Sequence, residues 1–277
     1  MSIKVKLKRA LIYILKGVPQ KNITASISYL SPSEHLKGKN IIVTGGGRGL
    51  GYAMAKKFVS EGANVLIAGR NVEILKKTSE ELGCQFIALD IQDIKSFDSF
   101  VEQADKMLGG VNCLVNNAGI SLHENSFFDV TPEGFDAQFE TNMKGAFFLT
   151  QKVITSMKYN NRTGTVLFVS SETGDTMDFR PYGFTKAAVN SMVQGLAYLF
   201  SKDNIRINAV APGITASDMT GLSSEGNLYF PMNMNERVYL PEEVAEVASY
   251  LLSDVSGCVS GQIITCNNAR TVNARWK

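Results

Sequence analysis

The sequence predicts one α/β domain in which helices cover both faces of a doubly wound, seven-stranded parallel sheet. From residue 39 onward, short apolar runs alternate with longer segments of helical periodicity, which is typical of repeated strand–helix–strand units. The first apolar run leads directly into a glycine-rich loop. The chain has 277 residues, 44% of them hydrophobic, and can therefore bury a sizeable core in a single domain.

The expected strands are seven short apolar runs, and the ends of several are marked by turn-forming residues. Two helix starts carry clear signals, because Thr131 precedes a proline and an acid, and Pro241 precedes two acids. Ligands of such a sheet bind beyond the carboxyl ends of the strands. The predicted strands are 40–44, 64–69, 85–89, 112–116, 165–170, 205–211 and 262–266.

The charge is unevenly distributed along the chain. The formal net charge is +2, yet residues 1–40 contain eight basic residues and one acid, whereas the other 237 contain 20 basic and 25 acidic residues. The mildly acidic body does not suggest a nucleic-acid partner. We therefore divide the chain into a basic arm, residues 1–37, and a doubly wound sheet domain, residues 38–277.

The arm has the pattern of an amphipathic helix that ends before Pro19. Its apolar residues recur at spacings of three and four, with lysine and arginine between them. Such a helix can lie on a membrane surface. We favour packing against the body or a neighbouring subunit. The apolar positions are Ile3, Leu7, Leu11, Ile14 and Val18.

Cysteine and histidine usage points to a reduced, cytoplasmic protein without a metal site. The four cysteines show no C-x-x-C spacing, and two histidines cannot form a metal-binding cluster. No window approaches the roughly 20 apolar residues of a membrane-spanning helix. We therefore expect a soluble protein.

The glycine loop is the predicted pyrophosphate site of a Rossmann-type sheet. Gly45 would form the tight turn, Gly49 would let the backbone approach an anion, and Gly51 would let helix and strand pack closely. Both the preceding strand and the following helix are present, as this motif requires. The candidate cofactor residues here are Thr44, Gly45, Gly47, Arg48, Gly49, Leu50 and Gly51.

The end of the second strand favours NADP(H) over NAD(H). NAD sites usually place an acid there for the ribose hydroxyls, whereas this chain has Arg70. With Arg48 in the glycine loop, two cations could bind a 2′-phosphate. Asp90, followed by Ile91, ends the third strand and could contact the adenine or cap the next turn.

Tyr182 and Lys186 are the candidate acid–base pair. They lie four residues apart in a helical pattern, so their side chains share one face. A phenol has a reference pKa of about 10, and a nearby cation favours its phenolate. We expect Lys186 to act on Tyr182 in this way while a nicotinamide transfers hydride.

Taken together, these motifs resemble the classical, single-domain branch of the short-chain dehydrogenase/reductase family over residues 38–268. The resemblance implies that Tyr182 is the acid–base residue and that Lys186 also binds the nicotinamide ribose. It implies that Ser171, three residues before Gly174, orients the substrate oxygen. By the same resemblance Asn142 holds a water that links Lys186 to solvent.

The resemblance also assigns a cofactor wall and a nicotinamide-side turn. Asn116 would be mainly structural in this family segment. The usual Asp-Gly-Gly after the last strand is replaced here by Asn267, Asn268 and Ala269. The further cofactor residues implied are Asn117, Ala118, Gly119, Pro212, Gly213 and Ser217.

The predicted function is transfer of a hydride between NADP(H) and a carbonyl or alcohol, in the direction of ketone reduction. Charges in the loop 172–181 favour a polar metabolite such as a sugar, while 3-oxoacyl compounds stay open because aromatic residues in other loops could bind an apolar body. A non-catalytic NADP(H)-binding regulatory or scaffold protein is the alternative. By resemblance, we expect a homodimer or homotetramer formed through helices 131–158 and 181–202.

Overall fold

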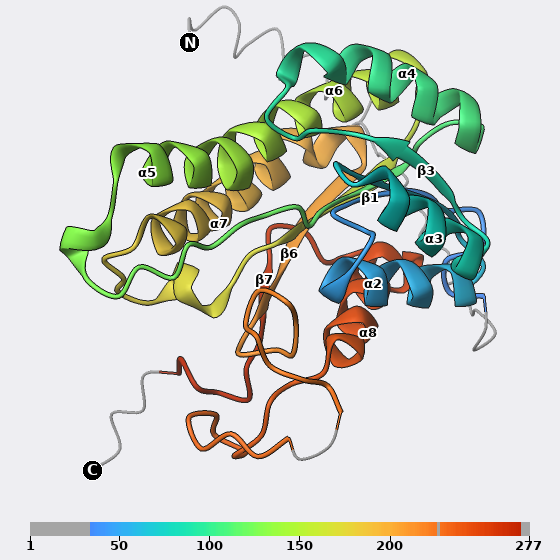
Figure 1. The fold of residues 1–277 in the computed structure, drawn as a ribbon. Coiled ribbons are helices and arrows are strands. Elements are labelled where there is room, and N and C mark those ends of the chain that lie inside the picture. Colours follow the sequence, from blue (N-terminus) through green and yellow to red (C-terminus); the bar gives the residue numbers. More distant parts are fainter. Residues whose placement is uncertain (1–33, 226–227, 273–277) are drawn as a thin grey trace, which may run out of the picture.

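The computed structural model describes residues 34–225 and 228–272, and its centre is a seven-stranded parallel sheet (Figure 1). The strand order is β3-β2-β1-β4-β5-β6-β7, so the order reverses between β1 and β4. All the pairings within the sheet are parallel. The predicted doubly wound, seven-stranded fold is confirmed.

Each predicted strand is present, and the predicted bounds differ from the observed ones by no more than one residue at either end. The largest helix, α7, is also where the sequence placed it. The strands are β1 (Asn40–Thr44), β2 (Asn64–Gly69), β3 (Gln85–Ala88), β4 (Cys113–Asn116), β5 (Gly164–Val169), β6 (Ile205–Pro212) and β7 (Ile263–Cys266). The α-helices are α2 (Gly49–Ser60), α3 (Val72–Leu82), α4 (Phe97–Leu108), α5 (Pro132–Phe139), α6 (Ala146–Tyr159), α7 (Pro181–Phe200) and α8 (Pro241–Leu252).

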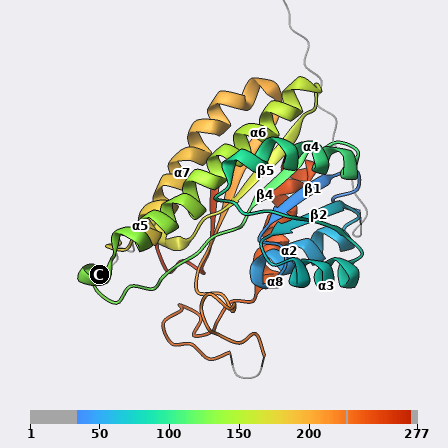
Figure 2. The ribbon, with the colours of Figure 1, turned by 45° about the horizontal axis from the view of Figure 1, so that its top comes forward.

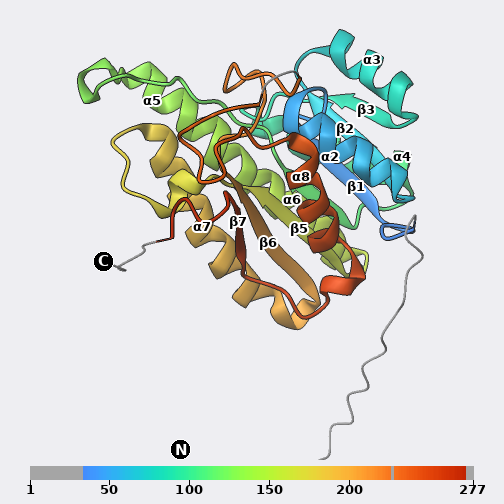
Figure 3. The ribbon, with the colours of Figure 1, turned by 90° about the horizontal axis from the view of Figure 1, so that it is seen from below.

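Two layers of helices cover the two faces of the sheet (Figure 2). One apolar core joins the sheet to α4, α6 and α7, and a second joins it to α2, α3 and α8. In Figure 3, α2 and α8 lie side by side over the second face. Strand side chains alternate between the cores: Ile41 and Val43 belong to one, and Ile42 to the other.

The described chain begins with a turn that belongs to the body. Leu36 is fully buried in the core beside α2 and α8, and its amide donates to the carbonyl of Glu61 at 3.0 Å. The rest of the predicted arm, residues 1–33, lies outside the described residues. In the described part of the chain, no helix has the length and apolar character needed to cross a membrane.

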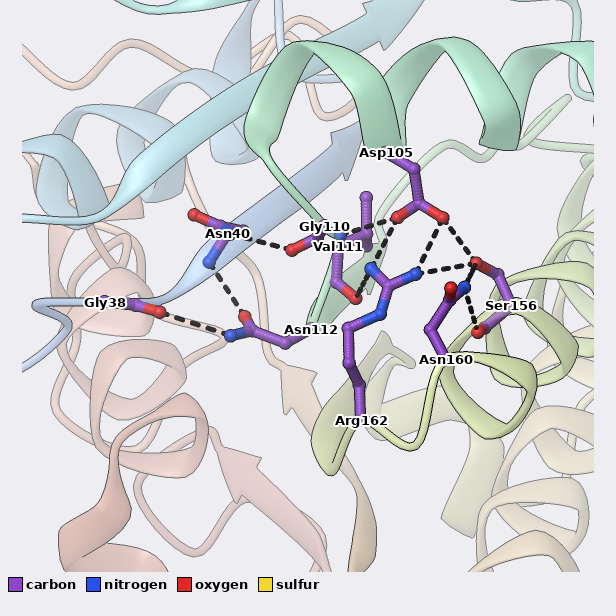
Figure 4. Close-up of polar contacts among 9 residues, drawn as sticks. All are labelled: Gly38, Asn40, Asp105, Gly110, Val111, Asn112, Ser156, Asn160 and Arg162. Atoms are coloured by element: carbon purple, nitrogen blue, oxygen red, sulfur yellow. Dashed lines mark hydrogen bonds and ion pairs between the residues drawn. The ribbon is translucent and has the colours of Figure 1, made fainter.

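The amino ends of the central strands are closed by a polar network (Figure 4). Arg162, before β5, donates from its two Nη atoms to the two carboxylate oxygens of Asp105 in α4, at 2.7 and 2.9 Å. Asn112, before β4, accepts from the amide of Asn40 at 2.8 Å. These bonds fix the starts of β1, β4 and β5 relative to one another.

The long helix predicted over 131–158 is interrupted at the opposite, carboxyl edge. Residues Glu140–Gly145 form a π-helical segment between α5 and α6. A π-segment inserts an extra residue into the helical turn and is often found at functional sites. Gly145 has no room for a side chain, because a Cβ would lie 2.2 Å from the carbonyl oxygen of Ile91. The interruption sets the position of Asn142.

Candidate active site

The glycine loop passes from β1 into α2 through positions where a side chain would collide. Gly45 has φ +65°, and a Cβ there would lie 2.9 Å from Asn117 Nδ2. A Cβ on Gly51 would lie 2.2 Å from the Gly45 carbonyl oxygen. Gly49 also has positive φ, +54°. Position 45 requires glycine, because its backbone is left-handed and a side chain there would collide with Asn117.

The other predicted loop residues make contacts within the protein. Thr44 is buried, and its Oγ accepts from the amides of Asn117 and Ala118, both at 3.0 Å, so it joins β1 to the segment after β4. Leu50 packs partly against the core. The Gly47 carbonyl accepts from Thr78 at 3.0 Å. Thr44 therefore shapes the loop through its side chain.

The start of α2 offers uncapped amides. Arg48 is the N-cap, with extended backbone, and no side chain caps the helix. The first amides of a helix have no intrahelical acceptor and attract anions. The glycine-lined approach and these free amides fit a dinucleotide pyrophosphate.

The two predicted phosphate-binding arginines lie near this helix start. Gly45 donates to the carbonyl of Ala68 at 2.7 Å, which brings the loop to the end of β2, just before the exposed Arg70. Arg48 lies 3.4 Å from Asp218, and both side chains are about 70% exposed. An ion pair this exposed is weak, so a bound phosphate could replace the carboxylate.

Asp90 and Ile91 follow β3 on the same edge. The Asp90 carboxylate accepts from the amide of Gln92 at 3.0 Å, so the turn-capping role, one of the two predicted, is present. Asp90 is exposed and Ile91 is buried beneath it. Ile91 also packs against Gly145, which links the predicted adenine side to the π-segment.

The turn after β6 is held against β7. Gly213 donates to the Cys266 carbonyl at 3.0 Å, and a Cβ on Gly213 would lie 2.8 Å from that of Asn267. Ser217 is half-buried, and the nearest atom to a Cβ on Gly49 would be the Ser217 Cβ, at 3.8 Å. Of the predicted nicotinamide-side residues, Ser217 therefore lies beside the glycine loop, and Gly213 packs against the segment after β7.

Lys186 is a buried cation on α7. Its side chain lies over the Tyr182 ring, with Nζ 5.4 Å from the ring centroid, and Nζ donates to the Val169 carbonyl at 2.8 Å. Burial lowers the pKa of Lys186 to about 8. Among the described residues, no carboxylate forms a salt bridge with it. The predicted shared face of Tyr182 and Lys186 is present.

Burial raises the pKa of Tyr182 above its usual value of 10. A hydrogen bond with Ser171 and the charge of Arg180 act in the opposite direction. The Lys186 ammonium is hydrogen-bonded to the Val169 carbonyl, and burial has the largest effect on the pKa of Tyr182, so stabilisation of the phenolate by Lys186 stays a prediction. Tyr182 therefore keeps its proton at neutral pH in this structure.

The hydroxyls of the two adjacent serines have different surroundings. Ser171 Oγ accepts from the amide and hydroxyl of Thr173, at 3.2 and 3.0 Å, and reaches Tyr182. Ser170 Oγ instead donates to Asn190 Oδ1 at 2.5 Å inside the protein. Of the two, Ser171 is the serine that hydrogen-bonds to Tyr182.

Asn142 braces the loop that follows β4. Its side chain accepts from the Ile120 amide and donates to the Ile120 carbonyl, both at 2.8 Å. A Cβ on Gly119 would lie 3.3 Å from Asn142 Oδ1 and 3.8 Å from Lys186 Nζ. Asn142 and Lys186 thus face each other across Gly119, while the water-binding role stays a prediction.

Two contributors were missed by the sequence argument. Thr185 is fully buried, accepts from Asn142 Nδ2 at 3.2 Å and donates to the Tyr182 carbonyl at 2.7 Å. Arg180 places a positive charge near Tyr182 and is held by Asp178 through two bonds of 2.9 Å. A hydroxyl three residues after the tyrosine was the available signal for Thr185.

Comparisons with known proteins agree with this geometry. A family model described as short chain dehydrogenase matches residues 39–227. The chain is 34% identical to a 3alpha-hydroxysteroid dehydrogenase from Mediterraneibacter gnavus, over 84% of this chain and 97% of that protein. It is 29% identical to an L-rhamnose 1-dehydrogenase (NADP(+)) from Thermoplasma acidophilum, over 86% of this chain and 98% of that protein. A solved short-chain type dehydrogenase/reductase from Mycobacterium ulcerans has a TM-score of 0.79 at 25% identity, covering 86% of this chain and 91% of that chain. The chain therefore belongs to the short-chain dehydrogenase/reductase family of oxidoreductases.

Proposed function

We propose that this oxidoreductase reduces a carbonyl group of a small molecule, with NADPH as the hydride donor. The observation that carries the proposal is the arrangement of Tyr182 between the Ser171 hydroxyl and the buried ammonium of Lys186. These groups lie at the carboxyl edge of the sheet, where the glycine loop also ends. Perturbed titratable groups at such an edge are typical of active sites.

The protein groups can supply the proton that reduction requires. NADPH, when bound, supplies the hydride. Tyr182 keeps its proton at neutral pH and donates it from the phenol oxygen to the carbonyl oxygen, while Ser171 hydrogen-bonds to the same oxygen. Lys186, with a pKa of about 8, is mostly charged at pH 7 and stabilises the phenolate that remains. Because Tyr182 is protonated at neutral pH, its proton is available for the reduction.

The preference for NADPH rests on charge near the glycine loop. Arg48 and Arg70 are exposed cations on this edge, and β2 ends at Gly69 and is followed by Arg70 in place of a carboxylate. A 2′-phosphate would be attracted to both arginines. NAD(H) is the alternative, because neither arginine contacts the pyrophosphate amides themselves.

The loop between Ser171 and α7 gives less support to a polar substrate than its composition suggested. Asp178 pairs with Arg180, and Asp175 accepts from Asn190 at 2.9 Å. Glu172 is buried against Arg270. Glu172 and Asp178 are thus paired with arginines within the protein, and only Asp175, which is hydrogen-bonded to a neutral amide, is exposed.

A polar substrate is supported instead by Glu124, in the loop after β4. A pocket of about 320 Å³ here is lined by Glu124 and mostly polar neighbours. Gln138 Nε2 donates to Glu124 Oε1 at 2.7 Å, while Oε2 is buried and without a hydrogen-bond partner among the described residues. Arg180 lies close enough for the charges of Glu124 and Tyr182 to act on it. The pocket beside Glu124 is lined mostly by polar residues, which suits a sugar or hydroxylated ketone better than a 3-oxoacyl chain.

We further propose a cytoplasmic homo-oligomer, either dimer or tetramer. All four cysteines are free, as expected in a reducing compartment. Large apolar side chains are exposed on α5, α6 and α7, the helices predicted to pair. They are Phe135, Tyr159, Phe184, Tyr198 and Leu199.

The test is consumption of NADPH, and of NADH in parallel, with keto sugars, hydroxylated ketones, simple aldehydes and 3-oxoacyl thioesters. Tyr182→Phe should lower kcat about 10²- to 10⁴-fold, the usual contribution of a general acid. Tyr250→Phe is the control, because Tyr250 is 43% exposed on α8, outside the helices expected to pair and away from the acid–base groups. NADPH binding, followed by its fluorescence, should persist in both variants. Equal turnover by Tyr182→Phe and the control would contradict the mechanism.

The competing function is a cofactor-binding regulatory or scaffold protein. It would bind NADPH but consume none with any carbonyl in the panel. The intact set of Ser171, Tyr182 and Lys186 favours the enzyme, because a binding protein has no need for a buried ammonium beside a phenol.

A further inference from the structure

A buried polar cluster joins the turn that carries Ser171 to the segment after β7. Glu172, the next residue, is 6% exposed. Its Oε2 accepts from Asn267 Nδ2 at 3.0 Å, and its Oε1 forms an ion pair with Arg270. The Asn267 carbonyl accepts from the Tyr239 hydroxyl at 2.9 Å. Both carboxylate oxygens of Glu172 are therefore bound from a segment about 95 residues away in sequence.

The residues of this cluster match one another in charge. The family's usual acid at position 267 would place a second carboxylate against Glu172, and two such groups repel. Asn267 supplies an amide donor of similar shape. The backbone beyond it nevertheless keeps left-handed conformations, with φ +49° at Asn268 and +65° at Ala269. The backbone of residues 268 and 269 thus keeps the conformation that glycine favours, whereas the side chain at position 267 is an amide, which can donate a hydrogen bond to Glu172.

The other side of the same turn is fixed to α7. Asp175 accepts from Asn190 Nδ2 at 2.9 Å, and Ser170 donates to Asn190 Oδ1. A Cβ on Gly174 would lie 2.9 Å from the Lys186 carbonyl oxygen. The turn Glu172–Asp175 is therefore clamped between the helix of the acid–base pair and the segment after β7. Ser171, its N-cap, is placed by both contacts.

We propose that Glu172 is a positioning residue, which with Asn267 and Arg270 holds Ser171 at the distance from Tyr182 that the reaction needs. The inference rests on the proposed carbonyl reduction. Glu172 does not itself reach the substrate oxygen, because both of its carboxylate oxygens are engaged inside the protein. Small displacements of a positioning group can lower turnover about 10²-fold.

A charge-swap cycle tests this role. Glu172→Gln and Asn267→Asp should each lower kcat about 10- to 100-fold, with KM for NADPH within about 2-fold of wild type. The double variant should regain most of kcat, because the amide introduced at position 172 can donate to the carboxylate introduced at position 267, with which Arg270 can also pair. Glu246→Gln, which removes an exposed carboxylate paired with Lys57 on α2, is the control and should leave kcat unchanged.

The pH dependence of kcat in Asn267→Asp distinguishes a positioning role from a purely structural one. In Asn267→Asp, two facing carboxyls share one proton with a raised pKa. Below about pH 7, where Lys186 is already charged in both proteins, the kcat of this variant should therefore rise as the pH falls, since the protonated carboxyl can donate as the Asn267 amide does, whereas the kcat of wild type should stay level.

Three results would overturn the inference. The first is a wild-type kcat in both single variants. The second is a double variant whose kcat is no higher than that of the single variants. The third is a lowered thermal stability of the single variants with an unchanged kcat. In each case, wild-type turnover that Tyr182→Phe abolishes leaves the proposed function standing. Wild-type protein that consumes no NADPH with any carbonyl in the panel would overturn both.

Discussion

The amino edge of the sheet pairs Arg162 with a carboxylate, whereas the carboxyl edge, which also holds the paired Glu172, leaves the buried Lys186 without one in the described part of the chain. At the amino edge, Arg162 and Asp105 are both about one-fifth exposed and neutralise each other through two bonds, and the pKa of the Asp105 carboxyl lies below its usual value (Figure 4). At the carboxyl edge, Lys186 is buried, and among the described residues its ammonium has a backbone carbonyl as acceptor and no carboxylate. A buried charge without a partner costs free energy. The unpaired lysine supports the proposal that Lys186 serves a reaction, whereas the paired charges at the amino edge are expected to serve stability.

Backbone conformation shows the same contrast. Each of the seven strands begins shortly after a residue with positive φ, and these residues are all glycine or asparagine, which tolerate that conformation. They are Gly38, Gly62, Gly83, Gly109, Gly110, Asn161, Asn204 and Gly261. Beyond the carboxyl edge, His123, Glu236 and Ala269 also have positive φ. Strained backbone is concentrated near functional sites in proteins, and here it is found on the loops around the candidate site.

The largest expected effect comes from Lys186→Met, which keeps the side chain's length and removes its charge. We expect kcat to fall about 10²- to 10⁴-fold, because the phenolate of Tyr182 loses its stabilising cation. Stability at pH 7 should not fall. NADPH turnover and urea unfolding measure the two effects.

The pH dependence of unfolding checks the physical reason. The folded pKa of Lys186, about 8, lies below the unfolded value of about 10.4, so folding is penalised at pH values below 8 and the penalty fades as the pH rises. Wild type should therefore gain stability relative to Lys186→Met between pH 8 and 10, by up to about 3 kcal/mol. If Lys186→Met has wild-type activity, or is clearly less stable than wild type at pH 7, the proposed difference between the two edges is wrong.

The matched substitution at the amino edge, Arg162→Met, should lower stability and leave activity nearly unchanged. It leaves the Asp105 carboxylate without its cation, and we expect a loss of about 2 kcal/mol in the free energy of unfolding. The kcat of the folded protein should stay within about 2-fold of wild type, since no group of the candidate site is touched. Lys152→Met, which breaks an exposed pair with Asp98, should cost less than about 1 kcal/mol. Loss of activity without loss of stability would show that the amino edge is coupled to catalysis.

The smallest effect is expected for Ala269→Gly. Alanine at φ +65° is strained, so glycine should raise the free energy of unfolding by about 1 kcal/mol. Ala187→Gly in α7, an exposed helical position, should lower it by a similar amount. Urea unfolding of both variants measures the difference. A decrease at both positions would mean that the segment after β7 stores no strain.

Much of the fold and of the site followed from local sequence pattern. Strand positions were predictable because buried parallel strands are short apolar runs bounded by turn residues. The Tyr182–Lys186 pair was predictable because helical spacing brings residues four apart onto one face. The π-segment at Asn142 was not, because it depends on the close packing of Gly145 against Ile91 from another part of the chain. Arg70 and Arg48 as phosphate ligands stay predictions.

The pairing of charged side chains was the other feature that could not be predicted from the local sequence. From composition, Glu172, Asp175 and Asp178 appeared to face a polar substrate. In the structure Glu172 is satisfied by Arg270 and Asn267, which are nearly 100 residues away, and Glu124 has one oxygen without a partner among the described residues. Whether a carboxylate is paired depends on which distant segments the fold brings together.

The sequence by itself determined the order of strands and helices, the glycine loop and the spacing of Tyr182 and Lys186, since these arise from contacts between near neighbours. The tertiary structure alone decided the protonation of those two groups and the clamping of Ser171. The physical reason is that a pKa depends on burial and on charges brought close by folding. Burial raises the pKa of Tyr182 and lowers that of Lys186, because in both residues it disfavours the charged form.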